Sequence, residues 1–163
     1  MLKKQIIGIV LLLVILSSMV LAACSNQAPI STPIKATWIK PVVTGDLVSV
    51  SASEVEKDTI THFKINTPTN ELAFMVYKYD GQLYARASIC PPCRSESFSL
   101  VKNTLVCDTC GTVFDAKTGS GIKGACVVFD KAAVPYEVKN GNIIMKWADL
   151  VTAFRNTQNP GKS

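Results

Sequence analysis

Residues 90–111 read CPPCRSESFSLVKNTLVCDTCG and contain two Cys-x-x-Cys pairs with thirteen residues between them. Cys90 and Cys93 form the first pair, and Cys107 and Cys110 form the second. The run between them, FSLVKNTLVC, has strand-forming residues on either side of a Lys-Asn turn and predicts a β-hairpin. We therefore expect each pair at the end of a strand, with four sulfurs at the tips of two neighbouring loops.

Four thiolates at this spacing are a strong signal for a bound centre and a weak one for its identity. They satisfy Zn²⁺ or a single iron, and equally a [2Fe-2S] or [4Fe-4S] cluster. The spacing is close to that of zinc ribbons. A pair outside the cytoplasm can also form a disulfide or act as a thioredoxin-like dithiol. Dithiol chemistry uses a helix that starts after the first cysteine, whereas RSESFSLVKN predicts a turn and a strand, so a bound centre is favoured.

The residues beside the cysteines differ between the two pairs. Gly111 follows the second pair, and its lack of a β-carbon lets a backbone N–H approach a sulfur. Pro91 and Pro92 lie inside the first pair and have no N–H. Cys90 therefore loses hydrogen bonds that would stabilise a negatively charged, reduced iron centre, which is expected to lower its redox potential.

Two further residues of metal-binding type lie outside the pairs. Cys126 is a candidate fifth ligand, a partner for one of the four sulfurs, or a buried thiol. His62, the only histidine, lies in the alternating run THFKI and is predicted to have a structural role. The sequence shows no Ser, His and acid pattern of a hydrolase and no Gly-rich phosphate loop before a helix. We therefore expect an electron carrier in preference to an enzyme with its own substrate.

The first 23 residues have the pattern of an export signal. Lys3 and Lys4 precede an apolar run of about sixteen residues, which is short for a spanning helix that needs roughly 20. The run ends in LAAC, which resembles the lipobox of bacterial lipoproteins and implies cleavage before Cys24 and acylation of its sulfur. An uncleaved N-terminal anchor is the alternative. Either way, the domain is expected at the extracytoplasmic face of the cell membrane.

The net charge argues against nucleic acid as a partner, and the number of cysteines argues against a framework of disulfide bonds. The chain has 17 Lys and Arg residues against 12 acidic ones, a net charge of +5. Without residues 1–23 there are 15 basic residues against 12 acidic ones, a net charge of +3. Because the chain has no basic cluster, nucleic acid is not an expected partner. Once lipid occupies Cys24, five of the six cysteines remain, an odd number that does not pair into a disulfide framework.

The rest of the chain divides into a tether, a domain and a tail. Residues 24–43 carry three prolines and no sustained period, which predicts a flexible tether. Residues 44–155 alternate strand patterns with turns and predict an all-β domain. Within it, Ser53 to Lys57 is expected to be a short turn. Residues 156–163 are predicted to be a loose tail.

Two hairpins and one helix are the clearest elements of the predicted domain. Asp80-Gly81 and Asn140-Gly141 tolerate positive φ and each predicts a tight hairpin between alternating runs. The stretch WADLVTAFRN places apolar residues at helical intervals, which predicts one amphipathic C-terminal helix that covers the sheet.

The two pairs, the stretch GTVFDAKTGSGIKGAC and the hairpin VPYEVKNGNIIM together resemble a Rieske domain. The resemblance implies a small antiparallel β sandwich or barrel with two Cys-x-x-Cys knuckles. A Rieske centre takes one Cys and one His from each knuckle, whereas all four positions here are Cys. Without the histidines that raise Rieske potentials, the potential is expected nearer the ferredoxin range of about −400 mV.

The closer resemblance is to the FtrD-like family of membrane iron-sulfur proteins. The stretches VSASEVEKDTITHFKI, ELAFMVYKYDGQLYARASICPPC, VCDTCGTVF and GIKGAC carry it, over about residues 50–126. It implies an iron-sulfur centre held by the family's paired cysteines, which are matched here by Cys90, Cys93, Cys107 and Cys110. Cys126 matches a further family cysteine. The resemblance implies electron transfer and a membrane redox or iron-transport partner; members often have several membrane spans before this domain, where this chain has only the lipobox-like segment.

Overall fold

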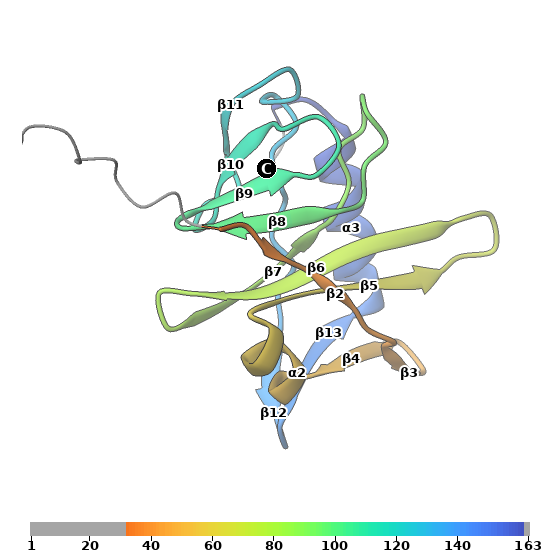
Figure 1. Cartoon of the computed structure of the whole chain (residues 1–163). Helices are drawn as coiled ribbons and strands as arrows, with labels where there is room; N and C mark the ends of the chain where they lie inside the picture. The colour runs from red at the N-terminus through yellow and green to blue at the C-terminus, as the bar shows by residue number, and fades with distance from the viewer. Residues whose placement is uncertain (1–31, 162–163) are drawn as a thin grey trace, which may run out of the picture. The chain divides into compact units, whose positions relative to one another are not determined.

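The computed structural model describes residues 32–161, which form three small β-sheets and two helices (Figure 1). The predicted export signal and the lipidation site Cys24 lie outside the described residues. Within residues 32–161, no helix has the length and apolarity needed to cross a membrane. The predicted all-β class with a C-terminal helix is confirmed.

The central sheet has the strand order β2-β5-β6-β7. Its strands are β2 (Thr37–Trp38), β5 (Ile60–Asn66), β6 (Glu71–Tyr79) and β7 (Gln82–Ala87). β6 and β7 form the hairpin predicted at Asp80-Gly81, and both turn residues have positive φ, 50° and 73°. β7 leads directly toward Cys90.

A second sheet, which we call the cysteine sheet, has the order β1-β8-β9-β10-β11. Its strands are β1 (Ile34–Lys35), β8 (Phe98–Val101), β9 (Thr104–Cys107), β10 (Val113–Asp115) and β11 (Gly121–Lys123). β8 and β9 are the hairpin predicted between the two cysteine pairs, with Lys102 at positive φ in its turn.

A third sheet, the distal sheet, lies on the other side of the central sheet in Figure 1 and has the order β12-β13-β4-β3. Its strands are β3 (Val42–Thr44), β4 (Leu47–Ser51), β12 (Glu137–Lys139) and β13 (Asn142–Lys146). Helix α3 (Trp147–Gln158) follows β13 without a break. The hairpin predicted at Asn140-Gly141 joins β12 and β13.

Strand β6 separates two hydrophobic cores. Phe74 and Val76 point to one core, which includes residues of β4, β13 and α3. Met75 and Tyr77 point to the other, which includes residues of the cysteine sheet and two of the paired cysteines. Successive side chains of a strand point to opposite faces, so a strand buried on both faces divides its apolar residues between two cores. The cysteine loops are therefore supported by a core of their own.

Two predicted domain boundaries and one predicted turn were wrong. The tail was predicted from residue 156, but helix α3 continues to Gln158, and Thr157 is buried and accepts a hydrogen bond from the N–H of Ala132. The predicted tether ended at residue 43, but β1, β2 and β3 already pair with β8, β5 and β4, so this part of the chain belongs to the domain. Strands of two or three residues are too short to show an alternating pattern in the sequence. They form because they pair with longer strands elsewhere in the chain. Ser53 to Lys57, predicted as a turn, lies in helix α2 (Ala52–Asp58), where Val55 is fully buried.

His62 is a fully buried side chain of β5. Neither ring nitrogen has a hydrogen-bonding partner among the described residues, and the Trp38 ring lies 5.0 Å away, centroid to centroid. Burial lowers the pKa of His62 to about 4, although the negative charge of Asp108 opposes the shift. His62 therefore stays neutral at pH 7, and its role is structural without the hydrogen bonds that a buried histidine usually makes.

We predict that acid destabilises the fold through His62. Between pH 6.5 and about 4 the unfolded chain takes up a proton that the folded chain does not, so the free energy of unfolding falls as pH falls, by about 3 kcal/mol in total. Above pH 6.5 the residue is neutral in both states and adds no pH dependence. Denaturant unfolding at several pH values measures the slope, and His62→Phe should flatten it. An equal slope in both proteins would contradict the prediction.

Candidate metal centre

The two cysteine pairs lie in loops of the same construction, which we call the first knuckle (residues 90–95) and the second knuckle (residues 107–112). In the first, the N–H of Cys90 donates to the carbonyl of Ser95 at 2.8 Å. In the second, the N–H of Cys107 donates to the carbonyl of Thr112 at 2.9 Å. Each bond closes a loop between a cysteine and the fifth residue after it, so both sulfurs of a pair stay on the same side.

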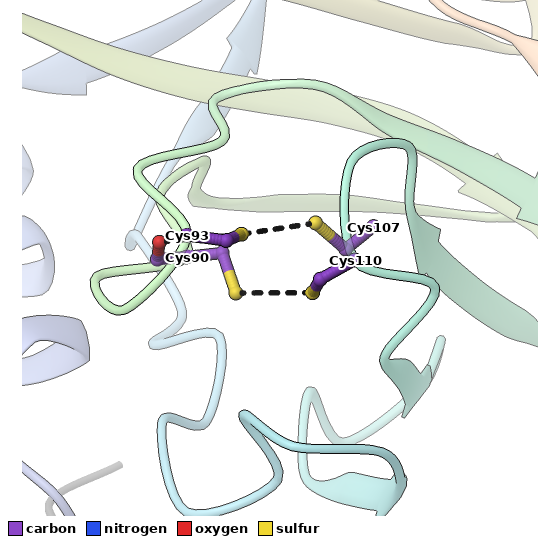
Figure 2. Close-up of side chains that lie close together, drawn as sticks. All are labelled: Cys90, Cys93, Cys107 and Cys110. Atoms are coloured by element: carbon purple, nitrogen blue, oxygen red, sulfur yellow. Dashed lines mark hydrogen bonds between the residues drawn. The ribbon is translucent and has the colours of Figure 1, made fainter.

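The two knuckles bring the four sulfurs together, as the sequence predicts. The Sγ atoms of Cys90, Cys93, Cys107 and Cys110 all lie within 4.8 Å of one another. Two of these contacts join the two knuckles, with 3.9 Å from Cys90 to Cys110 and 3.7 Å from Cys93 to Cys107 (Figure 2). All five cysteines of the described residues are free thiols. The sulfurs thus face one another across the loops and are not sealed into one disulfide per loop.

This donor set fits a soft metal centre. Four thiolates suit zinc and iron-sulfur centres, and no other type of donor side chain belongs to this close group. Four sulfurs bound tetrahedrally to one ion at 2.3 Å lie about 3.8 Å apart, which is the spacing between the knuckles. His62 is not part of the group.

The second knuckle has hydrogen-bond donors directed at its first sulfur. Burial raises the pKa of Cys107, while the backbone N–H groups of Cys110 and Thr109 and the hydroxyl of Ser95 oppose the shift. Such bonds favour the thiolate, which is the form that binds metal. Asp108 holds the second knuckle to the cysteine sheet. Its carboxylate accepts hydrogen bonds from the hydroxyls of Ser97 and Ser99 and forms an ion pair with Lys35 of β1.

The first knuckle has no such donors at positions 91 and 92, which are prolines. Burial raises the pKa of Cys90, and its contacts with the thiols of Cys126 and Cys93 raise it further. The charge of Lys131 opposes the shift. Sequence reasoning missed Lys131, because a single lysine in FDKAAVPY has the pattern of a surface loop and nothing in the sequence shows that it is buried.

Cys110 is the exposed member of the group, and Cys126 is a buried thiol behind it. The two Sγ atoms lie 3.8 Å apart, and Cys126 is outside the group of four mutually close sulfurs. The Thr112 hydroxyl lies 3.2 Å from Cys110 Sγ and accepts the N–H of Cys126 at 3.3 Å. Burial acts against the thiolate of Cys110, but the hydroxyl and N–H of Thr112 outweigh it and lower the pKa of Cys110 to about 6.

The comparison with protein families decides where the chain belongs. The family described as "Membrane iron-sulfur containing protein FtrD-like" matches residues 55–156, which is more than half of the chain. The chain belongs to the FtrD-like family. The matched region contains both knuckles and Cys126, so the paired cysteines of this FtrD-like protein lie inside the shared domain. No curated protein matches the chain.

The FtrD-like chain also has structural relatives. A chain from the "Complex of reduced oxygenase and oxidized ferredoxin in carbazole 1,9a-dioxygenase" has a TM-score of 0.52 and 22% identity, and the match covers 64% of this chain and 95% of that one. The plasma membrane Rieske protein PetC3 from Synechocystis PCC 6803 has a TM-score of 0.43 and 22% identity, with 59% and 94% covered. At this identity the first likeness establishes the fold alone, and the predicted Rieske-like fold is confirmed.

We predict that Cys110 is the most reactive thiol of the metal-free protein. Since its pKa is lowered to about 6, it is mostly thiolate at pH 7, whereas burial keeps Cys90 and Cys107 protonated. Iodoacetamide labelling at pH 7 followed by peptide mass spectrometry should find Cys110 modified first. Thr112→Val, which removes a hydrogen bond to the thiolate, should move the pH midpoint of labelling up by about one unit. Equal labelling rates for all three cysteines would contradict this assignment.

Proposed function

We propose that this chain is an extracytoplasmic, lipid-anchored electron carrier whose iron-sulfur centre is held by the two knuckles. The proposed ligands are Cys90, Cys93, Cys107 and Cys110. The observation that carries the proposal is the convergence of these four sulfurs in a domain of a membrane iron-sulfur family. When bound, a [2Fe-2S] or [4Fe-4S] centre supplies a place to hold one electron. Its partner is proposed to be a membrane redox or iron-transport protein.

The chain's own residues hold the centre and set its access to solvent. Cys90 and Cys107 are buried against the core of the cysteine sheet, while Cys110 is exposed and Cys93 is half-buried. Electrons are therefore proposed to enter and leave at the Cys93 and Cys110 side. Because both knuckles are closed by backbone hydrogen bonds and anchored to strands, the ligands keep nearly the same positions in both oxidation states.

A structural zinc site is the second candidate, and one observation favours it. The sulfur spacing between the knuckles is that of one tetrahedral ion, and a polynuclear cluster needs the thiolates further apart. In that case the four thiolates would stabilise the loops and the domain would act as an interaction module. A dithiol oxidoreductase is the third alternative, for which the absence of a helix after Cys90 is unfavourable.

We predict that anaerobically purified protein is brown, with iron, acid-labile sulfide, visible absorption and an EPR signal after reduction. Cys107→Ser should lose most of its iron and its visible absorption, because a ligand is removed. Cys126→Ser, which changes the buried thiol outside the group of four, is the matched control and should keep its iron.

The same measurements separate the three candidates. Colourless protein with one zinc per chain would support the structural zinc site and exclude the electron carrier. Metal-free protein whose pairs titrate as two dithiols would support the oxidoreductase. Full iron and sulfide in Cys107→Ser would refute the ligand assignment.

We also predict that Cys24 anchors the chain to the membrane. Cys24→Ser should prevent acylation and move the protein from the membrane fraction to the soluble extracytoplasmic fraction, because the thioether to the lipid cannot form. Metabolic labelling with a clickable fatty acid gives a direct readout. Unchanged membrane association together with an intact N-terminus would instead support the uncleaved anchor.

A further inference from the structure

Lys131 is a charged side chain in the interior of the domain, with no exposed surface. It lies between β11 and β12, and its Nζ donates a hydrogen bond to the carbonyl of Ile89 at 2.7 Å. The same atom lies 4.4 Å from the ring centroid of Phe114 and 5.3 Å from that of Phe98. Lysine is almost never fully buried unless it is paired, so this position needs an explanation.

The contacts of Lys131 lead to the two buried cysteines of the centre. Ile89, whose carbonyl it binds, directly precedes Cys90 in the chain. Phe98, whose ring it faces, is paired with Cys107 in the β8–β9 register. The ammonium group therefore lies close to the segments that carry the two buried cysteines, Cys90 and Cys107.

The backbone of Lys131 is held firmly in this position. Its carbonyl accepts a hydrogen bond from Arg86 Nη1 at 2.7 Å, and its N–H donates to Gly119 at 2.8 Å. Gly119 has a φ of 82°, and a side chain there would overlap the Lys131 carbonyl and the Arg86 guanidinium. Arg86 in turn donates to the Tyr77 hydroxyl at 2.8 Å. These contacts hold the backbone of Lys131 in the interior of the domain.

When the thiols of the sulfur site are ionised, as they would be in a bound centre, their negative charge acts on Lys131. Cys90, Cys107 and Cys126 attract it more strongly than Asp130, and together they oppose the burial that lowers the pKa of Lys131 to about 8. Four thiolates around one divalent ion carry a net charge of −2, and reduction of an iron centre adds one more negative charge. In the interior such charge is costly unless an opposite charge lies near it.

We propose that Lys131 is the buried countercharge of the four-cysteine centre, a positioning residue that stabilises the thiolates on the interior side and favours the reduced state. Its positive charge stabilises the thiolate of Cys90 in the first knuckle. Pro91 and Pro92 cannot do so, because they have no N–H to direct at Cys90. Transfer of one electron and no proton from a redox partner to a bound centre would raise the negative charge near the ammonium group by one. This role in reduction rests on the proposed function, whereas the role in holding thiolates does not.

The test compares four variants of the full chain. Lys131→Gln removes the charge but can still donate a hydrogen bond to Ile89, and Lys131→Met removes both. Lys131→Arg keeps the charge. Lys139→Gln changes an exposed lysine of β12 and is the control for net charge. Circular dichroism and thermal unfolding establish that each variant is folded.

The first readout is the affinity of the metal-free protein for Co²⁺, followed by the absorption of cobalt bound to thiolates. We expect at least tenfold weaker binding in Lys131→Gln and Lys131→Met, and unchanged binding in Lys131→Arg and Lys139→Gln. The second readout is the reduction potential of the iron-loaded protein. It should fall by at least 59 mV in both uncharged variants, which is a tenfold change in a one-electron equilibrium.

Unchanged Co²⁺ affinity and potential in folded Lys131→Gln would overturn the proposal. Loss of folding in both uncharged variants would also overturn it, since Lys131 would then be a structural residue. If the protein holds zinc and no iron, the electron-carrier function fails, but the Co²⁺ readout still decides the role of Lys131. The two failures are therefore distinguishable.

Discussion

The structure depends on strand β6 being buried on both faces. Its alternate side chains enter two separate cores, one shared with the distal sheet and helix α3 and the other with the cysteine sheet. A strand in this position cannot shift its register by one residue without exchanging the two sets of side chains. The hairpin that β6 forms with β7 leads to Cys90, so the register of one buried strand fixes where the first knuckle meets the second.

Much of this arrangement was predictable from the sequence. The two Asx-Gly hairpins, the hairpin between the cysteine pairs and the C-terminal helix all follow from local turn chemistry and periodicity, and all are present. The strands β1 to β3 and helix α2 were not predicted. They are short, and their structure comes from pairing with distant strands and from burial of a single valine, neither of which leaves a local pattern.

The clustering of the four sulfurs was predictable from the sequence, whereas the charged and polar groups around them were not. Four cysteines at this spacing converge whatever surrounds them, but the groups that stabilise their charge come from elsewhere in the chain. Ser95 acts on Cys107 from the other knuckle, and Lys131 lies 41 positions after Cys90. The two knuckles have the same backbone hydrogen bond but different groups around their buried sulfurs. In the second knuckle, N–H and hydroxyl donors act on Cys107, whereas in the first the buried ammonium group of Lys131 acts on Cys90.

The pairing of β1 with β8 would limit the distance between the domain and a lipid anchor at Cys24. Lys35 of β1 binds Asp108, the residue after Cys107, so the part of the chain that the structure describes begins beside the second knuckle. If lipid is attached at Cys24 as proposed, seven residues lie between it and residue 32, and the eight Cα–Cα steps span at most about 28 Å. A linker of this length would keep the domain within a few nanometres of the lipid headgroups. The redox group of a protein that exchanges electrons with this domain would then also have to lie within a few nanometres of the membrane surface.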